Sequence, residues 1–322
     1  MPHSQRSTTI ADRLGYELVL VARSGFRRSW TAPLAYPLST IRTIAAIVRH
    51  RPRAAIIVAP PFVAALVAWP FLRAIGAPFA IDVHTGALVD RRWRWSTAIL
   101  AWLARRGVGA VVTLPSLADP LAARGVTTFV IPDPLPDLTP RDAPPMADAP
   151  IVAAARIVAA VCGWGDDEPI EALIASAQGR PWQLVLTGRP RRPLELPDNV
   201  RLAGYLADDA YVDLLAAAAC VVVLTERDQT LLSGGWEAIA LGRPLVVSGT
   251  PSIRSTFGDE LTYVDATPEG IAAGIAAALA DPIAAARMAG LRERFGREND
   301  AALASLAARL TAGPGRVSGA SG

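Results

Sequence analysis

The sequence predicts an α/β protein of two domains, each built on a parallel β-sheet. Short β-branched runs alternate with Ala- and Leu-rich segments of helical length along the whole chain, which is typical of βαβ units. A length of 322 residues is sufficient for two such domains. A Pro-rich polar stretch near the middle has little capacity to form a core, so we expect it to link them.

The first domain is expected over residues 1–137. Its predicted strands lie near 17–22, 55–59, 78–83, 109–113 and 127–131, with helices between them. Residues 54–72 are uncharged and apolar over about the length that a bilayer requires. Three prolines interrupt them, so a buried strand followed by a short helix is favoured over a membrane span.

The linker is expected over 138–150 and the second domain over 151–282. Predicted strands lie near 151–157, 183–187, 199–203, 219–224, 244–248 and 261–264. Predicted helices lie at 168–177, 208–217, 234–241 and 268–280. A long helix of mixed polarity over 283–312 is expected to end the fold, and 313–322 is expected to be a disordered tail.

The basic residues are all arginine, because the chain contains no lysine. A Walker lysine, a Schiff-base lysine and a lysine nucleophile are therefore excluded, and any side chain that binds phosphate is an arginine. The two cysteines and three histidines have no metal-ligand spacing. We expect no metal and no cofactor, and the cysteine usage suits a cytoplasmic location.

Charge is divided unevenly along the chain. Residues 1–145 hold 17 Arg against 8 Asp and Glu, whereas residues 146–322 hold 15 against 21. The basic half suits an anionic membrane surface or a phosphorylated acceptor, and an ordinary solvated surface explains it equally well. No nucleic-acid-binding motif accompanies the arginines, so nucleic acid is not an expected partner.

The segment 221–248 carries the strongest functional signal. An apolar strand runs into a polar loop that ends in Ser233-Gly234-Gly235, and a helix with Glu237 in its first turn follows. Gly242-Arg243-Pro244 ends that helix before a second buried strand. This order places free backbone N–H groups and a helix N-terminus at the carboxyl edge of a parallel sheet, where anionic ligands bind.

That segment resembles the donor-binding motif of family-4-type glycosyltransferases, which have the GT-B fold of two Rossmann-like domains with parallel sheets facing across a cleft. Glu237 matches the family glutamate that holds the ribose of a nucleotide-sugar. Eight residues upstream, where the family has another glutamate, the chain has Gln229. The resemblance implies hexosyl transfer from a nucleotide diphosphate-sugar to a hydroxyl, with retention and without a metal.

Other loops of the second domain fall where these enzymes bind the donor. Gly163 and Trp164 belong to a loop that would let a ligand approach, and Trp164 would either stack on a sugar or pack between domains. Arg189 would reach the diphosphate. Tyr205 and Leu206 would contact the nucleobase of the donor. The loop that contains Thr230, Leu231, Ser233, Gly234 and Gly235 would bind phosphate through its backbone N–H groups.

The second domain and the first domain each depart from the family pattern in one further feature. The Arg-x4-Lys phosphate clamp is absent, and an acidic run, Asp166-Asp167-Glu168, stands in its region. We expect this run to cap the following helix. Only five residues precede Arg6, so the usual opening strand of the first domain is missing from this sequence.

Four residues of the first domain are candidates for contact with the transferred sugar or the acceptor. His84 follows a predicted strand and matches a family histidine that contacts the transferred sugar. Asp82, two residues earlier, would orient His84 or act as a base. Arg6 and Ser7 resemble an Arg-Ser pair that faces the acceptor in similar sequences.

Three functions remain open on this reasoning. The first is a glycosyltransferase that acts on a glycan or a lipid-linked glycan, with peripheral contact to an anionic membrane. The second is a catalytically degenerate partner protein of a polysaccharide assembly system, which Gln229, the absent clamp and the short N-terminus favour. The third is a nucleotide-sugar 2-epimerase, which shares the architecture but uses further acid and base groups.

Overall fold

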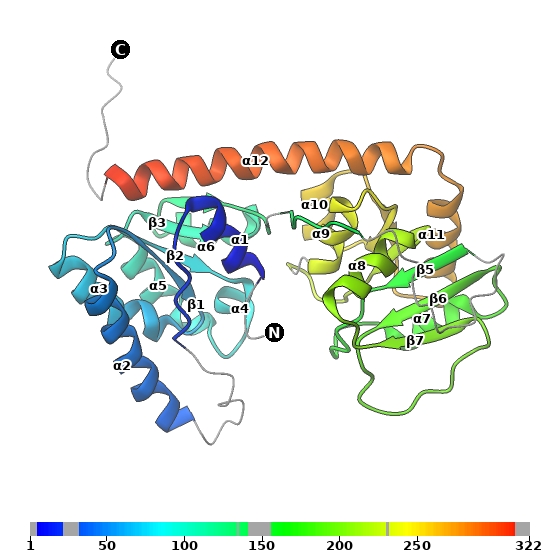
Figure 1. Cartoon of the computed structure of the whole chain (residues 1–322), viewed down its shortest axis with the longest axis horizontal. Coiled ribbons are helices and arrows are strands. Elements are labelled where there is room, and N and C mark those ends of the chain that lie inside the picture. Colours follow the sequence, from blue (N-terminus) through cyan, green and yellow to red (C-terminus); the bar gives the residue numbers. More distant parts are fainter. Residues whose placement is uncertain (1–4, 22–31, 134, 141–155, 230–231, 313–322) are drawn as a thin grey trace, which may run out of the picture. The chain divides into compact units, whose positions relative to one another are not determined.

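The computed structural model describes residues 5–21, 32–133, 135–140, 156–229 and 232–312. The chain divides into two compact units (Figure 1), each described by itself. Unit 1 comprises Met1–Pro134 and Arg297–Gly322, and unit 2 comprises Leu135–Gly296. The long helix α12, Ala284–Ala312, therefore contributes its beginning to unit 2 and its remainder to unit 1. Residues 141–150 of the expected linker and the expected tail lie outside the described residues.

Unit 1 contains a parallel sheet in the order β1-β2-β3-β4. The strands are β1 Ala55–Ala59, β2 Phe79–Val83, β3 Gly109–Val112 and β4 Thr128–Val130. The helices are α1 Gln5–Leu14, α2 Ala32–His50, α3 Phe62–Ala74, α4 Thr85–Val89, α5 Thr97–Ala104 and α6 Pro115–Ala122, with a 3₁₀ turn at Arg94–Ser96. Every residue of β2 and β3 is buried, as expected for strands covered on both faces.

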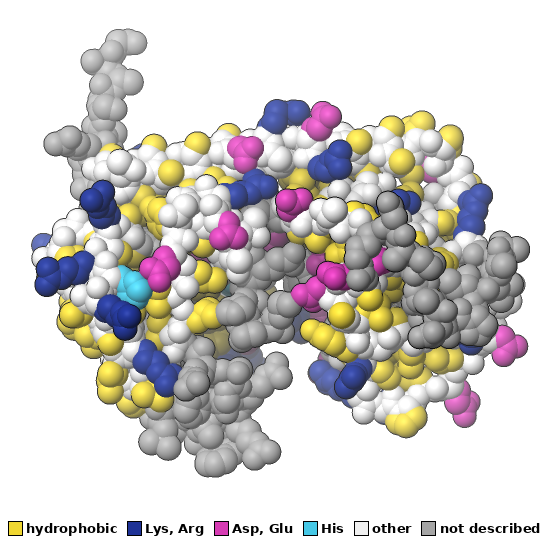
Figure 2. Space-filling model, in the orientation of Figure 1, with side chains coloured by type: hydrophobic (Ala, Val, Ile, Leu, Met, Phe, Trp, Pro, Cys, Tyr) yellow, Lys and Arg dark blue, Asp and Glu magenta, His cyan; other side chains and the backbone are white. Residues whose placement is uncertain are grey.

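The core of unit 1 joins the two ends of the chain. Ile10 of α1 packs with Val111 and Phe129 of the sheet, and Leu303 and Leu306 of α12 complete the cluster. Arginine and hydrophobic side chains lie next to one another on the surface of this unit (Figure 2). The apolar segment 54–72 forms β1 and α3, as its prolines predicted.

The expected strand at 17–22 is not formed in the residues that the structure describes there. Residues 17–21 have no strand assignment, and Leu18, Val19 and Leu20 are exposed. A strand requires a hydrogen-bonding neighbour as well as a suitable pattern, and no described strand pairs with this segment. The apolar pattern alone led to the wrong prediction.

Unit 2 contains a parallel sheet in the order β10-β9-β8-β5-β6-β7. The strands are β5 Arg156–Ala160, β6 Trp182–Thr187, β7 Val200–Gly204, β8 Cys220–Val223, β9 Leu245–Ser248 and β10 Thr262–Val264. The helices are α7 Ile170–Ala177, α8 Asp208–Ala217, α9 Ser233–Ala240, α10 Pro251–Phe257 and α11 Pro268–Ala280. This is the doubly wound Rossmann order, with β5 and β8 at the point where the strand order reverses.

The sequence located the strands and most helices of unit 2. Its first strand, expected over 151–157, is described from Arg156, because residues 151–155 lie outside the described residues, and the short helix α10 was not expected. Helix α10 starts at Pro251 and is capped by the Thr250 side chain, which accepts a hydrogen bond from Ile253 N. Its local signals are the Thr250 cap, Pro251 at the first position and the buried pair Ile253 and Phe257, which are four residues apart.

Among the described residues, no single helix has the length and apolarity needed to cross a membrane. The helices α11 and α12, which are bent by 92° relative to each other, together have the length and composition of a broken membrane span, and nothing else in the described part of the chain indicates one. The apolar side chains of α11, including Ile271 and Ile275, pack into the core of unit 2.

Candidate functional site

The loops that follow β5 and β8 meet at the reversal point of the unit 2 sheet. Thr225 Oγ1, just after β8, donates to Asp167 Oδ2 at 2.8 Å, and Glu226 N donates to Asp167 O at 2.7 Å. Asp167 therefore joins the two loops rather than facing solvent alone. Ligands of doubly wound sheets bind outside the carboxyl ends of these strands, so polar groups at this edge are candidates for ligand binding.

Glu237 lies on α9 at this edge of the sheet, with only 8% of its surface exposed. Helix α9 begins at Ser233, so Glu237 is one full turn into the helix and not in the first turn as expected. Tyr211 Oη on α8 donates a hydrogen bond to Glu237 Oε2. Burial raises the pKa of Glu237, and the Tyr211 hydrogen bond offsets part of that rise.

The start of α9 packs directly against the loop after β5. A Cβ on Gly234 would lie 2.8 Å from Val161 Cβ, so only glycine fits there without displacing Val161. No side chain caps α9, since Leu232 occupies the N-cap position, and Ser233 is exposed. Gly235 is buried, and its N–H donates to Leu232 O at 3.1 Å. Thr230 and Leu231 lie outside the described residues.

Glu168 occupies the backbone N–H groups of the loop after β5. Its carboxylate accepts hydrogen bonds from Gly163 N at 3.0 and 2.9 Å, Trp164 N at 3.2 Å and Gly165 N at 3.2 Å. We expected this acidic run to cap the following helix, but α7 has Pro169 at its N-cap and no side-chain cap. The carboxylate instead closes its own loop, because successive N–H groups form an anion-binding concavity.

Trp164 is buried in the core of unit 2 and is not available for stacking on a ligand. Its Nε1 donates to Thr187 O at 2.9 Å, and its ring packs with the β5–β6 side of the core. The Trp164 ring packs within unit 2, which is neither of the two roles expected from the sequence. Gly163 contributes its N–H to Glu168 rather than to an open surface.

The loop after β8 is held by the start of α10. Asp228 Oδ1 accepts from Ser252 N at 2.9 Å, and Gln229 N donates to Ser252 Oγ at 3.2 Å. Gln229 has a φ of 57°, so this loop is tightly turned. Burial raises the pKa of Asp228, but hydrogen bonds from Ser252 and Gln229 outweigh it and the pKa is lowered.

Arg189 and Tyr205 are two accessible members of the predicted set with side chains suited to a ligand. Arg189 follows β6, is exposed, and has no hydrogen bond or ion pair within the described residues. Tyr205, after β7, is 67% exposed, and Leu206 beside it is half-buried against the core. These positions leave a guanidinium and an aromatic ring free for a ligand.

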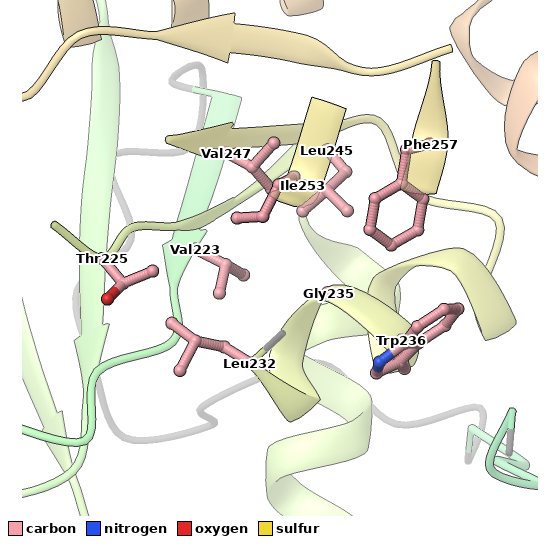
Figure 3. A pocket seen from close by; sticks show the side chains of 9 residues that line it. All are labelled: Val223, Thr225, Leu232, Gly235, Trp236, Leu245, Val247, Ile253 and Phe257. Carbon is pink, nitrogen blue, oxygen red and sulfur yellow. The ribbon is translucent and has the colours of Figure 1, made fainter. Parts of the chain in front are cut away.

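A small apolar pocket lies beneath the start of α9 (Figure 3). Its lining residues are Val223, Thr225, Leu232, Gly235, Trp236, Leu245, Val247, Ile253 and Phe257. Apart from Thr225 and the Trp236 indole, its walls are apolar, and the Thr225 hydroxyl is bound to Asp167. The pocket therefore offers too few polar groups for a phosphate or a ribose, and Glu237 does not line it.

Unit 1 holds a buried network of charges at the carboxyl end of β2. Asp82 is 2% exposed; its Oδ2 lies 3.1 Å from His84 Nε2, and its Oδ1 lies 3.3 Å from Arg6 Nη2. Arg6 Nη1 also contacts Asp133 Oδ1 at 3.0 Å and donates to Ile131 O at 2.8 Å. Burial raises the pKa of Asp82, but Arg6 and His84 together lower it by more, so the pKa is below its ordinary value.

This network changes the interpretation of Arg6. It was expected to face an acceptor, but its guanidinium is buried among Asp82, Asp133 and a backbone carbonyl. Ser7, the next residue on α1, is half-buried. His84 occupies the N-cap position of α4 without a side-chain cap, and 30% of its side chain is exposed, as is 28% of the Asp133 side chain.

No group of three or more His, Cys, Asp or Glu side chains is placed to hold a metal ion within the described residues.

Comparison with known proteins identifies the architecture. No family model matches the chain, and no curated protein matches it. A structure of Anabaena HepE in complex with UDP superposes with a TM-score of 0.70 and 15% identity, covering 96% of this chain and 97% of that one. Sucrose-phosphate synthase from Thermosynechococcus elongatus gives a TM-score of 0.67 and 20% identity, covering 87% and 78%. The chain has the GT-B fold.

The GT-B fold is shared by enzymes of more than one activity. A putative UDP-N-acetylglucosamine 2-epimerase from Listeria monocytogenes superposes with a TM-score of 0.59 and 13% identity, covering 94% of this chain and 85% of that one. At these identities the likeness establishes architecture, and the activity has to be argued from the residues.

Sequence reasoning did not find the contacts of three residues near the candidate sites: Tyr211, Asp133 and Glu168. Tyr211 stands in a helix rich in alanine and leucine, 26 residues from Glu237, and nothing in the local pattern marks it. Asp133 lies 127 residues from Arg6. Glu168 was noticed as part of an acidic run, but its partners depend on the turn of the loop that precedes it.

Proposed function

We propose that the protein is a glycosyltransferase that transfers a hexosyl group from a nucleotide diphosphate-sugar to a hydroxyl group. The observation that carries this proposal is the buried Glu237 on α9, beside the carboxyl ends of β5 and β8 in a GT-B fold. A carboxylate has two oxygens that can accept hydrogen bonds from the two hydroxyls of a ribose. Structures of Anabaena HepE, which has this architecture, contain UDP or UDP-glucose, which supports a nucleotide-sugar donor.

The donor diphosphate would be neutralised without a metal. Arg189 has a free guanidinium at the end of β6, and the uncapped start of α9 supplies N–H groups and the positive end of a helix dipole. Departure of the nucleotide diphosphate develops negative charge on its phosphate oxygens, and preorganised donors of this kind stabilise that charge.

In unit 1, His84 would hydrogen-bond a hydroxyl of the transferred sugar or the acceptor. Asp82 holds His84 Nε2, so the ring orientation is fixed and Nδ1 is left for a ligand. By resemblance we propose retention of configuration. We also propose a glycan or lipid-linked glycan as the acceptor, met in the cytoplasm at an anionic membrane.

The proposal is tested by thermal unfolding in the presence of UDP, GDP, ADP and their sugar conjugates. A nucleotide at 100 times its Kd stabilises the folded state by about 2.7 kcal/mol. For a protein with domains of this size we expect one nucleotide to raise the Tm by several degrees and the others to have little effect.

Turnover with the stabilising nucleotide-sugar then separates the remaining functions. Transfer to an added acceptor supports the glycosyltransferase, and conversion of the nucleotide-sugar without acceptor indicates an epimerase. Binding without either reaction indicates a catalytically degenerate protein. Absence of a shift with every nucleotide contradicts the proposed donor site.

Replacing Tyr211 with Phe is expected to weaken nucleotide binding about fivefold to tenfold, because Glu237 loses a partner that orients its carboxylate. The Tyr211 hydrogen bond lowers the pKa of Glu237, so its loss raises that pKa further. A ribose requires the carboxylate form, and acidification should therefore abolish binding at a higher pH in this variant. Calorimetric titration between about pH 5 and 8 measures both effects.

The matched control is Tyr263→Phe, which removes another partly buried hydroxyl of unit 2 that donates to Gly258 O. Tyr263 does not contact Glu237, so this control should bind nucleotide as the unaltered protein does. Equal weakening in both variants, or an unchanged pH profile for Tyr211→Phe, would show that Tyr211 has only a structural role.

A further inference from the structure

A turn on unit 1 presents arginine and tryptophan to solvent. The segment Asp90-Arg91-Arg92-Trp93-Arg94-Trp95 follows α4, and the Trp95 side chain is 62% exposed. The three arginines are exposed as well. We call this segment, together with the exposed Leu66 of α3 and Val89 of α4, the Arg–Trp surface.

The Arg–Trp surface is ordered by its own hydrogen bonds. Asp90 O accepts from Trp93 N and Arg94 N at 2.9 Å, and Asp90 Oδ1 accepts from Arg92 N at 2.8 Å. Trp95 Nε1 donates to Arg92 O at 2.8 Å. The only acid of the turn is therefore engaged by the backbone, and the only polar atom of Trp95 is satisfied inside the turn.

Phe62 holds the Trp95 ring in place. The two ring centroids are 5.4 Å apart with an interplanar angle of 80°, which is the edge-to-face arrangement that aromatic pairs favour. Trp95 is thus fixed while most of its carbon surface remains in water. Burying that surface against an apolar partner is favourable and costs little ordering of the side chain.

We propose that the Arg–Trp surface docks unit 1 on an anionic lipid bilayer. Arginines attract the negative surface of such a membrane, and tryptophan is the side chain that settles at the boundary between headgroups and acyl chains. Leu66 and Val89 add aliphatic surface, which suits acyl chains and offers no hydrogen bonds to nucleobases. The net positive charge of residues 1–145 acts in the same direction.

The surface also stands next to the reacting side of unit 1. His84 is the N-cap of α4, and the Arg–Trp turn begins where this helix of 5 residues ends. A docked bilayer would therefore lie near His84, as a lipid-linked acceptor requires. Only this last point rests on the proposed function, because binding to vesicles does not depend on nucleotide binding or turnover.

Co-sedimentation with vesicles tests the inference. The full chain is mixed at low salt with vesicles of phosphatidylcholine alone, or of phosphatidylcholine with about 30% phosphatidylglycerol, the anionic lipid that should attract arginines. We expect binding to the anionic vesicles only. The triple change Arg91→Ser, Arg92→Ser and Arg94→Ser should lower the partition coefficient about 100-fold, and Trp95→Ser about tenfold.

A control with the same charge change uses Arg49, Arg53 and Arg73, which are exposed elsewhere in unit 1. The variant with these three arginines changed to Ser should lose much less affinity, and all variants should unfold at the temperature of the unaltered protein. Equal loss in the control variant overturns the assignment, because it would show a general charge effect. Equal binding to neutral vesicles, or binding to a single-stranded oligonucleotide that the Arg–Trp changes abolish, overturns it too.

Discussion

Replacement of Glu237 by Gln is expected to remove nucleotide binding and to stabilise the free protein. The change keeps the size of the side chain but removes the charge that ribose hydroxyls would meet. Hydrogen bonds to a charged group contribute about 1.5–3 kcal/mol each, so loss of the carboxylate should weaken binding at least about tenfold to 100-fold. Calorimetry with the nucleotide that stabilises the unaltered protein measures this directly.

The same change should raise the free energy of unfolding of the ligand-free protein, because the carboxylate of Glu237 is buried. Its folded-state pKa is raised, so the folded protein binds this proton more tightly than the unfolded chain does. Stability therefore falls as pH rises from the unfolded pKa to the folded pKa, and the ionised carboxylate remains a cost above that window. The Gln variant lacks this cost, so its Tm without ligand should be higher at neutral pH.

An exposed glutamate on the loop after β8 provides the comparison. Glu226→Gln removes the same charge close by, and Glu226 is exposed with its backbone N–H on Asp167. It should leave both nucleotide affinity and Tm nearly unchanged. Unaltered nucleotide affinity in Glu237→Gln would exclude Glu237 from the donor site and remove the observation on which the proposed function rests.

Replacement of Arg6 by Met is expected to destabilise the protein by about 3–5 kcal/mol, because removal of one partner leaves a buried charge uncompensated. Arg6 is 6% exposed and Asp82 is 2% exposed, so water cannot replace the lost guanidinium without opening the core. Urea unfolding measures the free energy, and a change below about 1 kcal/mol would contradict a buried pair.

Arg13→Met is the matched control, since Arg13 lies on the same helix and pairs with the exposed Asp300 at 2.9 Å. Exposed pairs contribute about 0–1 kcal/mol, so this variant should lose little. A double variant, Arg6→Met with Asp82→Asn, removes both charges and should recover part of the stability lost in Arg6→Met alone.

The pH dependence of the Arg6 variant should reverse. In the unaltered protein the pKa of Asp82 is lowered, so its contribution to stability is present above the unfolded pKa and disappears as pH falls through the folded value. Without Arg6, burial is the larger influence and raises the pKa of Asp82. Stability of the variant should then rise on acidification through that region, whereas the unaltered protein becomes less stable.

Much of unit 2 could be predicted because its signals are local. The strands β6, β8 and β9 are short buried runs, and the segment from β8 to β9 keeps its strand–loop–helix–strand order in the structure. Glu237 became a candidate from that order and from its match to a family motif. In unit 1, residues 17–21 show the limit of such signals, since their apolar pattern has no described strand to pair with.

The sequence by itself determined the α/β class, the absence of lysine chemistry and the strand–loop–helix–strand order around Glu237. These follow from composition and from periodicity within one element. The tertiary structure decided which side chains meet: Tyr211 with Glu237, and Arg6 with Asp82, which is 76 residues away. Such pairs depend on how distant elements pack, and whether a charged group binds a ligand or a buried partner depends on that packing.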